Sequence, residues 1–275
     1  MPRIQSPSSI LTYKQCPRKY YYQYIAKLPT KPSIHLIRGS IAHSVLEDFF
    51  KINIEEMNKS NYVSKLKEII QEMLLHEWTK NNKRFDNLNL EKSKIGFYFD
   101  ETMMMMLNFI NHFIFRIEKR INKGMSFKEA FNQLTPVTEK RYISMKHRVQ
   151  GYIDAIEEID EKIKLIDYKT SKNAIISDEY KLQLAIYALL YNEKHAKLPH
   201  KVGINFLKDV TQYLDVNEEL LKLAEFEIEQ IHMATETDKI EDYPLNPGPL
   251  CKWSTGQCDF YEKCYDEDGN LREKR

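Results

Sequence analysis

The stretch that decides the fold lies between Gly151 and Thr170. It reads Gly151-Tyr-Ile-Asp154 and then Leu165-Ile-Asp167-Tyr-Lys169-Thr170, with Glu158-Ile-Asp-Glu161 between the two parts. We predict two antiparallel strands joined as a hairpin, because turn-type residues separate two apolar segments. A two-residue loop at Asp160-Glu161, or a four-residue loop from 159 to 162, makes Asp154 face Asp167 at about 5 Å between Cα atoms.

Lys169 falls two residues beyond Asp167 and therefore on the same face of its strand. Carboxylates opposite each other destabilise a sheet unless a cation neutralises them, so this face suggests a divalent metal site with an ammonium helper. A solvated polar face on an ordinary hairpin is the alternative. The second strand is apolar on both faces near its end (Ile163, Leu165, Ile166, Tyr168), as in a buried central strand. Because buried charges are paired or bind metals, we favour a metal-dependent hydrolase.

Composition limits the class of protein. The chain has 275 residues, enough for one large or two modest domains, with 42% hydrophobic and 12% aromatic residues. Its formal net charge of +1 gives no whole-protein argument for nucleic acid. No segment reaches the roughly 20 apolar residues that span a bilayer, and the N-terminus lacks a secretory signal. We therefore expect no membrane association and a reducing, cytoplasmic location, where cysteines bind metal more often than they form disulfides.

Residues 1–38 differ from the rest because they contain seven basic residues, no acidic residue and several tyrosines. The tyrosines are Tyr13, Tyr20, Tyr21, Tyr22 and Tyr24. Basic side chains neutralise phosphates and aromatic faces stack on unpaired bases, which favours DNA binding. A tyrosine-lined helix packed on the core explains the same pattern equally well.

The hydrophobic spacing predicts helices and strands in the following order. Helices are expected at about 10–27, 39–57, 62–123 with a loop near 81–89, 178–195 and 218–235. Strands are expected at 137–142, 146–157, 162–170, 201–208 and near 211–216. This order indicates an α/β core with an N-terminal helical insertion.

Four cysteines are distributed unevenly. Cys16 stands alone near the N-terminus, whereas Cys251, Cys258 and Cys264 are close together near the C-terminus. Four thiolates ligate zinc or an iron–sulfur cluster, and such a set could join the two ends of the chain. Four unrelated thiols are the alternative.

Five short motifs in this order resemble RecB-type nucleases. They are the segment Ser6 to Tyr20 around Cys16-Pro, Gly39-Ser-Ile-Ala-His43-Ser-Val-Leu-Glu47, Gly151-Tyr-Ile-Asp154, Asp167-Tyr-Lys169-Thr170 and Gln183-Leu-Ala-Ile-Tyr187. With the cysteines, the sequence is similar to the iron–sulfur branch of the PD-(D/E)XK superfamily over residues 6 to 264. That branch includes CRISPR-adaptation exonucleases, the AddB nuclease module and phage exonucleases. The resemblance implies a restriction-endonuclease-like core, a short mixed sheet flanked by helices.

The resemblance also implies roles for individual residues. His43, Asp154, Asp167 and the carbonyl of Tyr168 would bind Mg²⁺ or Mn²⁺, and Lys169 would orient the attacking water and stabilise charge on the phosphate. Gln183 and Tyr187 would support the site from one helix face. Glu139 resembles an acidic residue behind the metal ligands. Cys16, Cys251, Cys258 and Cys264 would hold a [4Fe–4S] cluster.

The cysteine spacing departs from the family pattern. The first C-terminal gap holds six residues instead of two, with Ser254 where the second cysteine would fall, while the x5 gap is kept. Zinc therefore stays open as the alternative metal at these cysteines.

The resemblance implies a metal-dependent DNA exonuclease that acts on single strands or DNA ends in recombination, repair, phage DNA processing or CRISPR adaptation. The sequence has no G-x-x-x-x-G-K-[ST] motif, so any unwinding would come from a helicase or other partner. Two alternatives from other classes are a non-catalytic DNA-binding or assembly module and a zinc-stabilised scaffold. A sequence-specific endonuclease is a third alternative, disfavoured because no separate recognition domain is visible. We expect four segments: a basic, aromatic helix (1–38), a helical region with His43 (39–135), the nuclease core (136–240) and a cysteine-rich segment (241–275).

Overall fold

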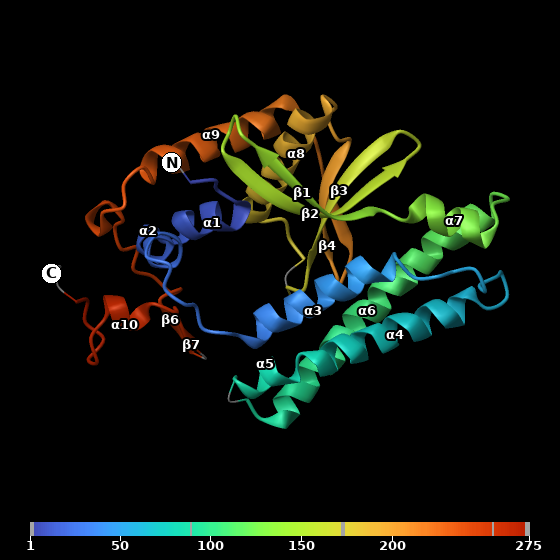
Figure 1. Cartoon of the computed structure of the whole chain (residues 1–275), viewed down its shortest axis with the longest axis horizontal. Helices are drawn as coiled ribbons and strands as arrows, with labels where there is room; N and C mark the ends of the chain where they lie inside the picture. The colour runs from blue at the N-terminus through green and yellow to red at the C-terminus, as the bar shows by residue number, and fades with distance from the viewer. Residues whose placement is uncertain (1–2, 89, 172–173, 255, 273–275) are drawn as a thin grey trace. The chain divides into compact units, whose positions relative to one another are not determined.

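The structure is a computed structural model that describes residues 3–88, 90–171, 174–254 and 256–272 (Figure 1). The chain forms two compact units, each assembled from separate stretches of sequence. One unit contains residues 32–142 and 151–221, and the other contains residues 1–31, 143–150 and 222–275. The expected division into four segments stays a prediction.

A mixed five-stranded sheet is the centre of the larger unit, with strand order β1-β2-β3-β4-β5. The strands are β1 (Val137–Ser144), β2 (Val149–Ile159), β3 (Lys162–Lys169), β4 (Lys201–Phe206) and β5 (Thr211–Asp215). β3 is central, antiparallel to β2 and parallel to β4. The predicted short mixed sheet and the buried central strand are both confirmed.

The β2–β3 hairpin has the predicted register. Its pairs run from Ala155 opposite Ile166 to Ile159 opposite Lys162, and the same register continued by one residue sets Asp154 against Asp167. The loop is the two-residue one, because Asp160 and Glu161 have φ values of 51° and 62°. Two consecutive positive φ values form the type I′ turn, whose twist matches that of the strands.

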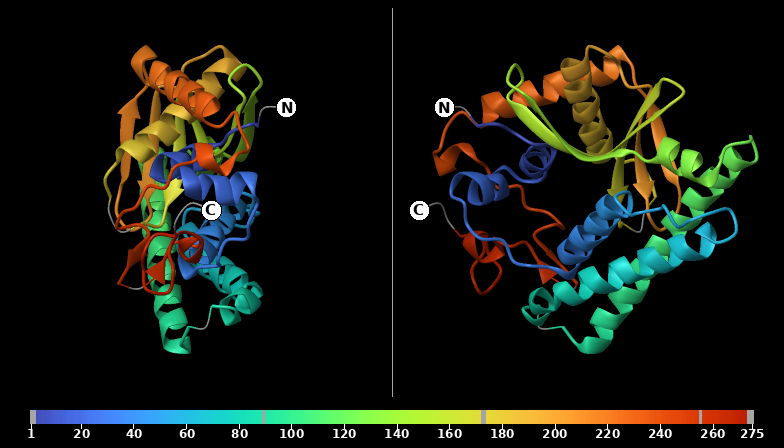
Figure 2. Two further views of the ribbon diagram at one scale, coloured as in Figure 1. Left: turned by 90° about the vertical axis from the view of Figure 1, so that its left-hand side faces the viewer. Right: turned by 45° about the vertical axis from the view of Figure 1, so that its right-hand side comes forward.

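Helices that precede the sheet in sequence form their own layer. α3 (Ile34–Phe49), α4 (Tyr62–Lys80) and α6 (Lys92–Ile121) pack on one another, as Figures 1 and 2 show. Their facing side chains form a core of aliphatic and aromatic residues that is continuous with Ala155, Ile166 and Tyr168 of the sheet. The predicted helical insertion is confirmed, although α3 begins five residues before Gly39 because Ser33 caps it.

Two short helices in the described part of the larger unit escaped prediction. α5 (Asn82–Asp86) lies in the expected loop, and α7 (Phe127–Leu134) comes directly before β1. Ser126 and Glu129 form a capping box at the start of α7. This S-x-x-E signal was visible in the sequence and could have located the helix.

α8 (Asp178–His195) begins and ends where the sequence predicts, with Ser177 as its N-cap. Its residues from Leu184 to Tyr191 are buried, and the helix packs against β3 and β4. α8 therefore sets side chains directly beside the end of the central strand.

The smaller unit joins the two ends of the chain. It contains α1 (Pro7–Gln15), α2 (Pro17–Tyr20) and a π-helical turn (Tyr21–Ile25) from the N-terminus. From the C-terminus it contains most of α9 (Glu218–Ala234), a 3₁₀ turn (Ile240–Asp242), β6 (Lys252–Trp253), β7 (Gly256–Gln257) and α10 (Tyr261–Cys264). Figure 1 shows the N-terminal helices beside the C-terminal segment.

The prediction of one helix over residues 10–27 was wrong. Cys16 adopts extended dihedrals (φ −162°, ψ 112°) between α1 and α2. Pro17 causes the break, because proline disfavours helical dihedrals in the residue before it and has no N–H to donate. The break leaves Cys16 at a helix junction.

The N-terminal tyrosines favour the packing interpretation over base stacking. Tyr20 and Tyr22 are buried, and Tyr20 stacks on Tyr243 with ring centroids 6.0 Å apart. The guanidinium of Arg3 lies 4.3 Å from the ring centroid of Tyr24. These aromatic rings therefore contribute to packing inside the smaller unit.

None of the helices in the described ranges is long and apolar enough to cross a membrane.

Candidate active site

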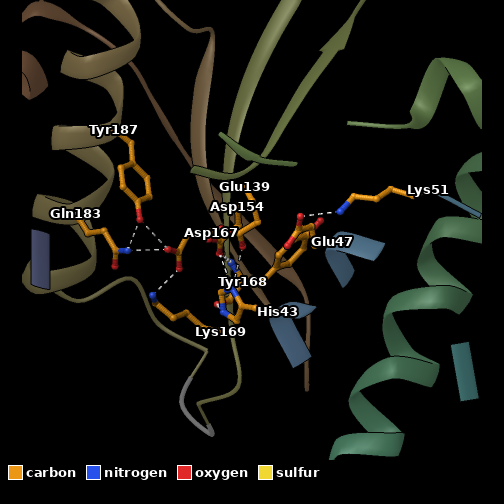
Figure 3. A network of polar contacts seen from close by, with 10 residues as sticks. All are labelled: His43, Glu47, Lys51, Glu139, Asp154, Asp167, Tyr168, Lys169, Gln183 and Tyr187. Atoms are coloured by element: carbon orange, nitrogen blue, oxygen red, sulfur yellow. Dashed lines mark hydrogen bonds and ion pairs between the residues drawn. The ribbon is translucent and has the colours of Figure 1, made fainter. Parts of the chain in front are cut away.

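His43, Glu139 and Asp154 bring three potential metal ligands together in the larger unit (Figure 3). One ligand atom from each lies within 4.8 Å of the others. The Nδ1 atom of His43 is 3.4 Å from Oδ2 of Asp154 and 3.7 Å from Oε1 of Glu139. One imidazole with two carboxylates is a donor set that suits Mg²⁺ or Mn²⁺.

Backbone contacts fix two members of this group. Nε2–H of His43 donates to the carbonyl oxygen of Tyr168 at 3.0 Å, and the backbone N–H of Tyr168 donates to Oδ2 of Asp154 at 2.7 Å. The histidine and the carbonyl that the resemblance assigns as ligands therefore meet at the end of β3.

Asp167 and Lys169 form a second group beside the first. Nζ of Lys169 is 2.6 Å from Oδ2 of Asp167. Nε2 of Gln183 donates to Oδ1 of Asp167 at 2.7 Å, and the Tyr187 hydroxyl donates to the same oxygen at 3.4 Å (Figure 3). Nε2 of Gln183 also donates to the Tyr187 hydroxyl at 2.8 Å. The two α8 residues thus hold one oxygen of Asp167 and Lys169 holds the other.

The structure brings all the predicted nuclease residues together, but the contacts of two of them differ from those predicted. Glu139, predicted to lie behind the ligands, belongs to the three-residue group with His43 and Asp154. Asp167, predicted as a ligand, directs its carboxylate to Lys169 and α8. The spacing of motifs could not reveal these different positions of Glu139 and Asp167, because they depend on the direction in which each carboxylate points.

The backbone of Glu139 explains its position. Its φ is 48°, in the left-handed region, within an extended strand. This conformation costs a non-glycine residue about 1–2 kcal/mol. Such outliers gather at functional sites, where the surrounding structure enforces them.

Close packing explains why position 151 is a glycine. A Cβ atom at this position would lie 3.1 Å from a ring carbon of Tyr187 and 3.3 Å from a methyl carbon of Leu190. Glycine therefore lets α8 approach β2 closely enough for Tyr187 to reach Asp167.

A buried cation supports the chain after Lys169 and was not predicted. Arg38 forms an ion pair with Glu101, and its Nη2 donates to the carbonyl oxygen of Thr170 at 3.3 Å. Lys208 also pairs with Glu101. Arg38 is only 4% exposed, so this network fixes the segment that follows the central strand.

Electrostatics in the site favour cations. Burial opposes a charged imidazole, yet hydrogen bonds to Asp154 and Glu139 outweigh it and raise the pKa of His43 to about 10. Burial also opposes a charged Lys169, but Asp167 and Asp154 raise its pKa above the ordinary value. Lys169 is therefore an ammonium at neutral pH.

The pKa of Asp167 is raised as well, which for a carboxyl group favours the neutral form. Burial, and then repulsion from Asp154, raise its pKa to about 6, against the lowering effect of Lys169. The carboxyl is 2% exposed, so ionising it within the fold is costly.

This shift predicts a pH-dependent stability when a chelator keeps metal away. The pKa of Asp167 is higher in the folded chain than in the unfolded chain. Its contribution to the free energy of unfolding is therefore fully present below about pH 4 and is lost as the pH rises to about 6. Asp167→Asn abolishes this titration. Relative to wild type, the variant should gain free energy of unfolding between pH 4 and 7, measured by urea titration. Asp100→Asn, at an exposed position, should show no such gain, and a pH-independent difference for Asp167→Asn would contradict the assignment.

The four cysteines line one small cavity in the smaller unit, together with Tyr22, Phe260 and Tyr265. All four are free and half-buried. Burial raises the pKa of Cys264 to about 11, and Cys16, Cys258 and Cys251 contribute to the same shift. No three of their sulfurs lie within 4.8 Å of one another in the described part of the chain. Because Cys16 and the three C-terminal cysteines line the same cavity, the two ends of the sequence meet at these thiols.

Comparison with known proteins decides the family. A family model described as the PD-(D/E)XK nuclease superfamily matches residues 5–265. The chain belongs to this superfamily. The predicted family and its restriction-endonuclease-like fold are thereby confirmed.

Two curated proteins with related sequences have nuclease names. The chain is 23% identical over 214 residues to one subunit of the ATP-dependent helicase/deoxyribonuclease of Carboxydothermus hydrogenoformans. It is 28% identical over 123 residues to the CRISPR-associated exonuclease Cas4 of Francisella tularensis subsp. novicida. These matches cover 68% and 45% of the chain, but only 18% and 59% of the two relatives.

A solved structure has a similar fold over the full length. The crystal structure of a candidate exonuclease from Eubacterium rectale aligns with all of this chain and 91% of its own, with a TM-score of 0.52 and 12% sequence identity. At this identity the likeness concerns the fold alone.

Proposed function

We propose that this PD-(D/E)XK protein is a metal-dependent DNA exonuclease that hydrolyses phosphodiester bonds in single strands or at DNA ends. One observation supports the proposal above others. The cluster of His43, Glu139 and Asp154 lies beside the Lys169–Asp167 pair at the end of one buried strand. The names of the two relatives, a helicase/deoxyribonuclease component and an exonuclease, support DNA as the substrate.

Each residue has a role in this proposal. His43, Glu139 and Asp154 would hold Mg²⁺ or Mn²⁺, with the Tyr168 carbonyl and Asp167 as further oxygen ligands. A bound divalent cation activates water and neutralises charge on the phosphate. Lys169, kept cationic by Asp167, donates to a non-bridging phosphate oxygen. Gln183 and Tyr187 orient Asp167.

Cleavage assays test the activity directly. We would incubate the protein, purified without oxygen, with end-labelled linear DNA and with circular DNA, each single- and double-stranded, in Mg²⁺, Mn²⁺ or EDTA. An exonuclease degrades linear DNA only, in the presence of metal. Equal cleavage of circular DNA would replace the exonuclease assignment with an endonuclease. DNA binding without cleavage in either metal would favour a non-catalytic module that assembles with a helicase or recombination partner.

We further propose that Cys16, Cys251, Cys258 and Cys264 hold a [4Fe–4S] cluster. A zinc ion with 2.3 Å bonds requires sulfurs about 3.8 Å apart in a tetrahedron. No three of these described sulfurs all lie within 4.8 Å of one another, so they are not in the arrangement that a zinc ion requires. The shared cavity supports the same four ligands despite the six-residue gap.

Removing one thiol should release the cluster. We expect Cys258→Ser to lose the iron and the broad visible absorption of the anaerobic protein and to lower its melting temperature, because the two chain ends are no longer joined. Elemental analysis and absorption spectra measure this. Zinc without iron in the wild type would support the zinc alternative instead.

A further inference from the structure

A cavity of about 430 Å³ lies on the sheet face opposite the catalytic side chains. Side chains alternate along β3, so Lys162, Lys164, Ile166 and Tyr168 line the cavity while Asp167 and Lys169 point to the other face. One face of α6 closes it, through residues that include Phe109, Phe113 and Arg116. We call this cavity the α6 pocket. Its volume is typical of small-molecule sites, about 300–1,000 Å³.

Aromatic rings form the walls of the α6 pocket. Phe50 and Tyr213 line the pocket and are only half-buried. Gly203 pairs with Tyr213 across β4 and β5, and a Cβ at Gly203 would lie 2.6 Å from the Tyr213 ring. Glycine thus lets this ring lie against the sheet beside the cavity. Aromatic rings that line a pocket can stack on nucleobases.

A buried carboxylate in the wall has one free oxygen. Glu157 is 6% exposed, and its Oε1 accepts a 2.6 Å hydrogen bond from Nη1 of Arg116. Its Oε2 is buried and accepts no hydrogen bond from any described residue. A buried acceptor without a donor is costly, so a group that enters the pocket and offers an N–H would be stabilised here. Glu157 and Arg116 together present an acceptor beside donors, the complement of a base edge.

The rim of the α6 pocket is cationic. Lys119, Arg120, Lys162 and Lys164 line it, and Asp160 is the one carboxylate besides Glu157 among its described lining residues. Glu157 is balanced by Arg116. Nζ of Lys164 lies 5.1 Å from the Tyr213 ring centroid, so the ammonium is adjacent to the aromatic wall. Lysine and arginine clusters bind phosphate through charge-assisted hydrogen bonds.

We propose that the α6 pocket binds a nucleoside 5′-monophosphate. The base contacts the Tyr213 and Phe50 rings, its polar edge contacts Glu157 and Arg116, and the phosphate contacts Lys162 and Lys164. The nucleotide is either free or the terminal residue of a DNA strand, since both present the same groups. This site is separate from the proposed nuclease centre and needs no catalysis.

Calorimetry with the full chain tests the pocket. We would use Lys169→Ala as the background, so that binding is measured independently of cleavage. The probes are the four deoxynucleoside 5′-monophosphates, 5′-phosphorylated linear single-stranded DNA and circular single-stranded DNA. Adding Lys162→Gln and Lys164→Gln should weaken nucleotide binding at least about tenfold, the loss expected for one charge-assisted hydrogen bond. The matched control carries Lys83→Gln and Lys94→Gln, two exposed positions outside the pocket lining, and should bind as the background does.

The probes separate the two sources. Binding of free nucleotides, lost in the pocket variant, supports a free ligand. Weak binding of free nucleotides, with a pocket-dependent preference for linear 5′-phosphorylated DNA over circular DNA, supports a strand end. No saturable binding of nucleotides together with no preference for linear DNA overturns the proposal, as does equal loss in the control variant.

A second substitution tests the base edge. Glu157→Gln keeps the size of the side chain but replaces one acceptor oxygen with an NH₂ donor. It should change the order of affinity among the four nucleotides while binding of inorganic phosphate stays the same. An unchanged order in a folded variant would remove Glu157 from the site. If the variant does not fold, the lysine variants still decide the proposal.

Discussion

Lys169→Ala should lower the rate of DNA cleavage by at least about 10²–10³-fold, the loss seen when one preorganised donor to a developing charge is removed. Lys169 is ionised and 2.6 Å from Asp167, so its ammonium is already positioned before substrate arrives. DNA binding should survive, because the phosphate backbone meets many other cations. End-labelled single- and double-stranded DNA, with Mg²⁺ or Mn²⁺, measures the cleavage rate, and a gel shift measures binding.

Lys181→Ala is the matched control for this experiment, since Lys181 is exposed on α8. It should cleave at the wild-type rate. Retained cleavage in Lys169→Ala would remove this lysine from the reaction.

Asp154→Asn should lose both metal binding and cleavage. Asp154 is 7% exposed, lies 3.4 Å from His43 and belongs to the three-residue ligand group. Removing groups that merely support a metal ligand costs about 10–100-fold in affinity, so loss of a ligand carboxylate should cost at least the upper value. Asparagine keeps an oxygen that can accept from the Tyr168 N–H, which limits structural damage. Calorimetric titration with Mn²⁺ measures the affinity.

Parallel titrations of Glu139→Gln and Asp167→Asn identify the remaining ligands. We expect Glu139→Gln to weaken Mn²⁺ binding, because its carboxylate faces His43. Asp215→Asn, on an exposed strand end, is the control. Wild-type affinity in Asp154→Asn would place the metal elsewhere.

The sequence was most informative where local signals agreed. The β2–β3 register followed from turn chemistry and strand alternation, and the bounds of α8 followed from its cap and its apolar pattern. The same register set Asp154, Asp167 and Lys169 on one face. That His43, Gln183 and Tyr187 would join them was predictable only through the motif order of the family.

The sequence was least informative where the backbone conformation of single residues decides the position of a helix end or a side chain. The break at Cys16 required weighing Pro17 against an unbroken helical pattern. The inward position of Glu139 depends on one left-handed residue within a strand, which no periodicity encodes. The α6 pocket depends on α6 and four strands that meet only after folding.

The left-handed backbone of Glu139 has a consequence for directed evolution. Glycine adopts such dihedrals without the steric strain that other residues experience. A library selected only for heat resistance would therefore favour glycine at position 139, and the enriched clones would lack a carboxylate beside His43. Engineers who want a more durable nuclease should hold this codon constant and vary others.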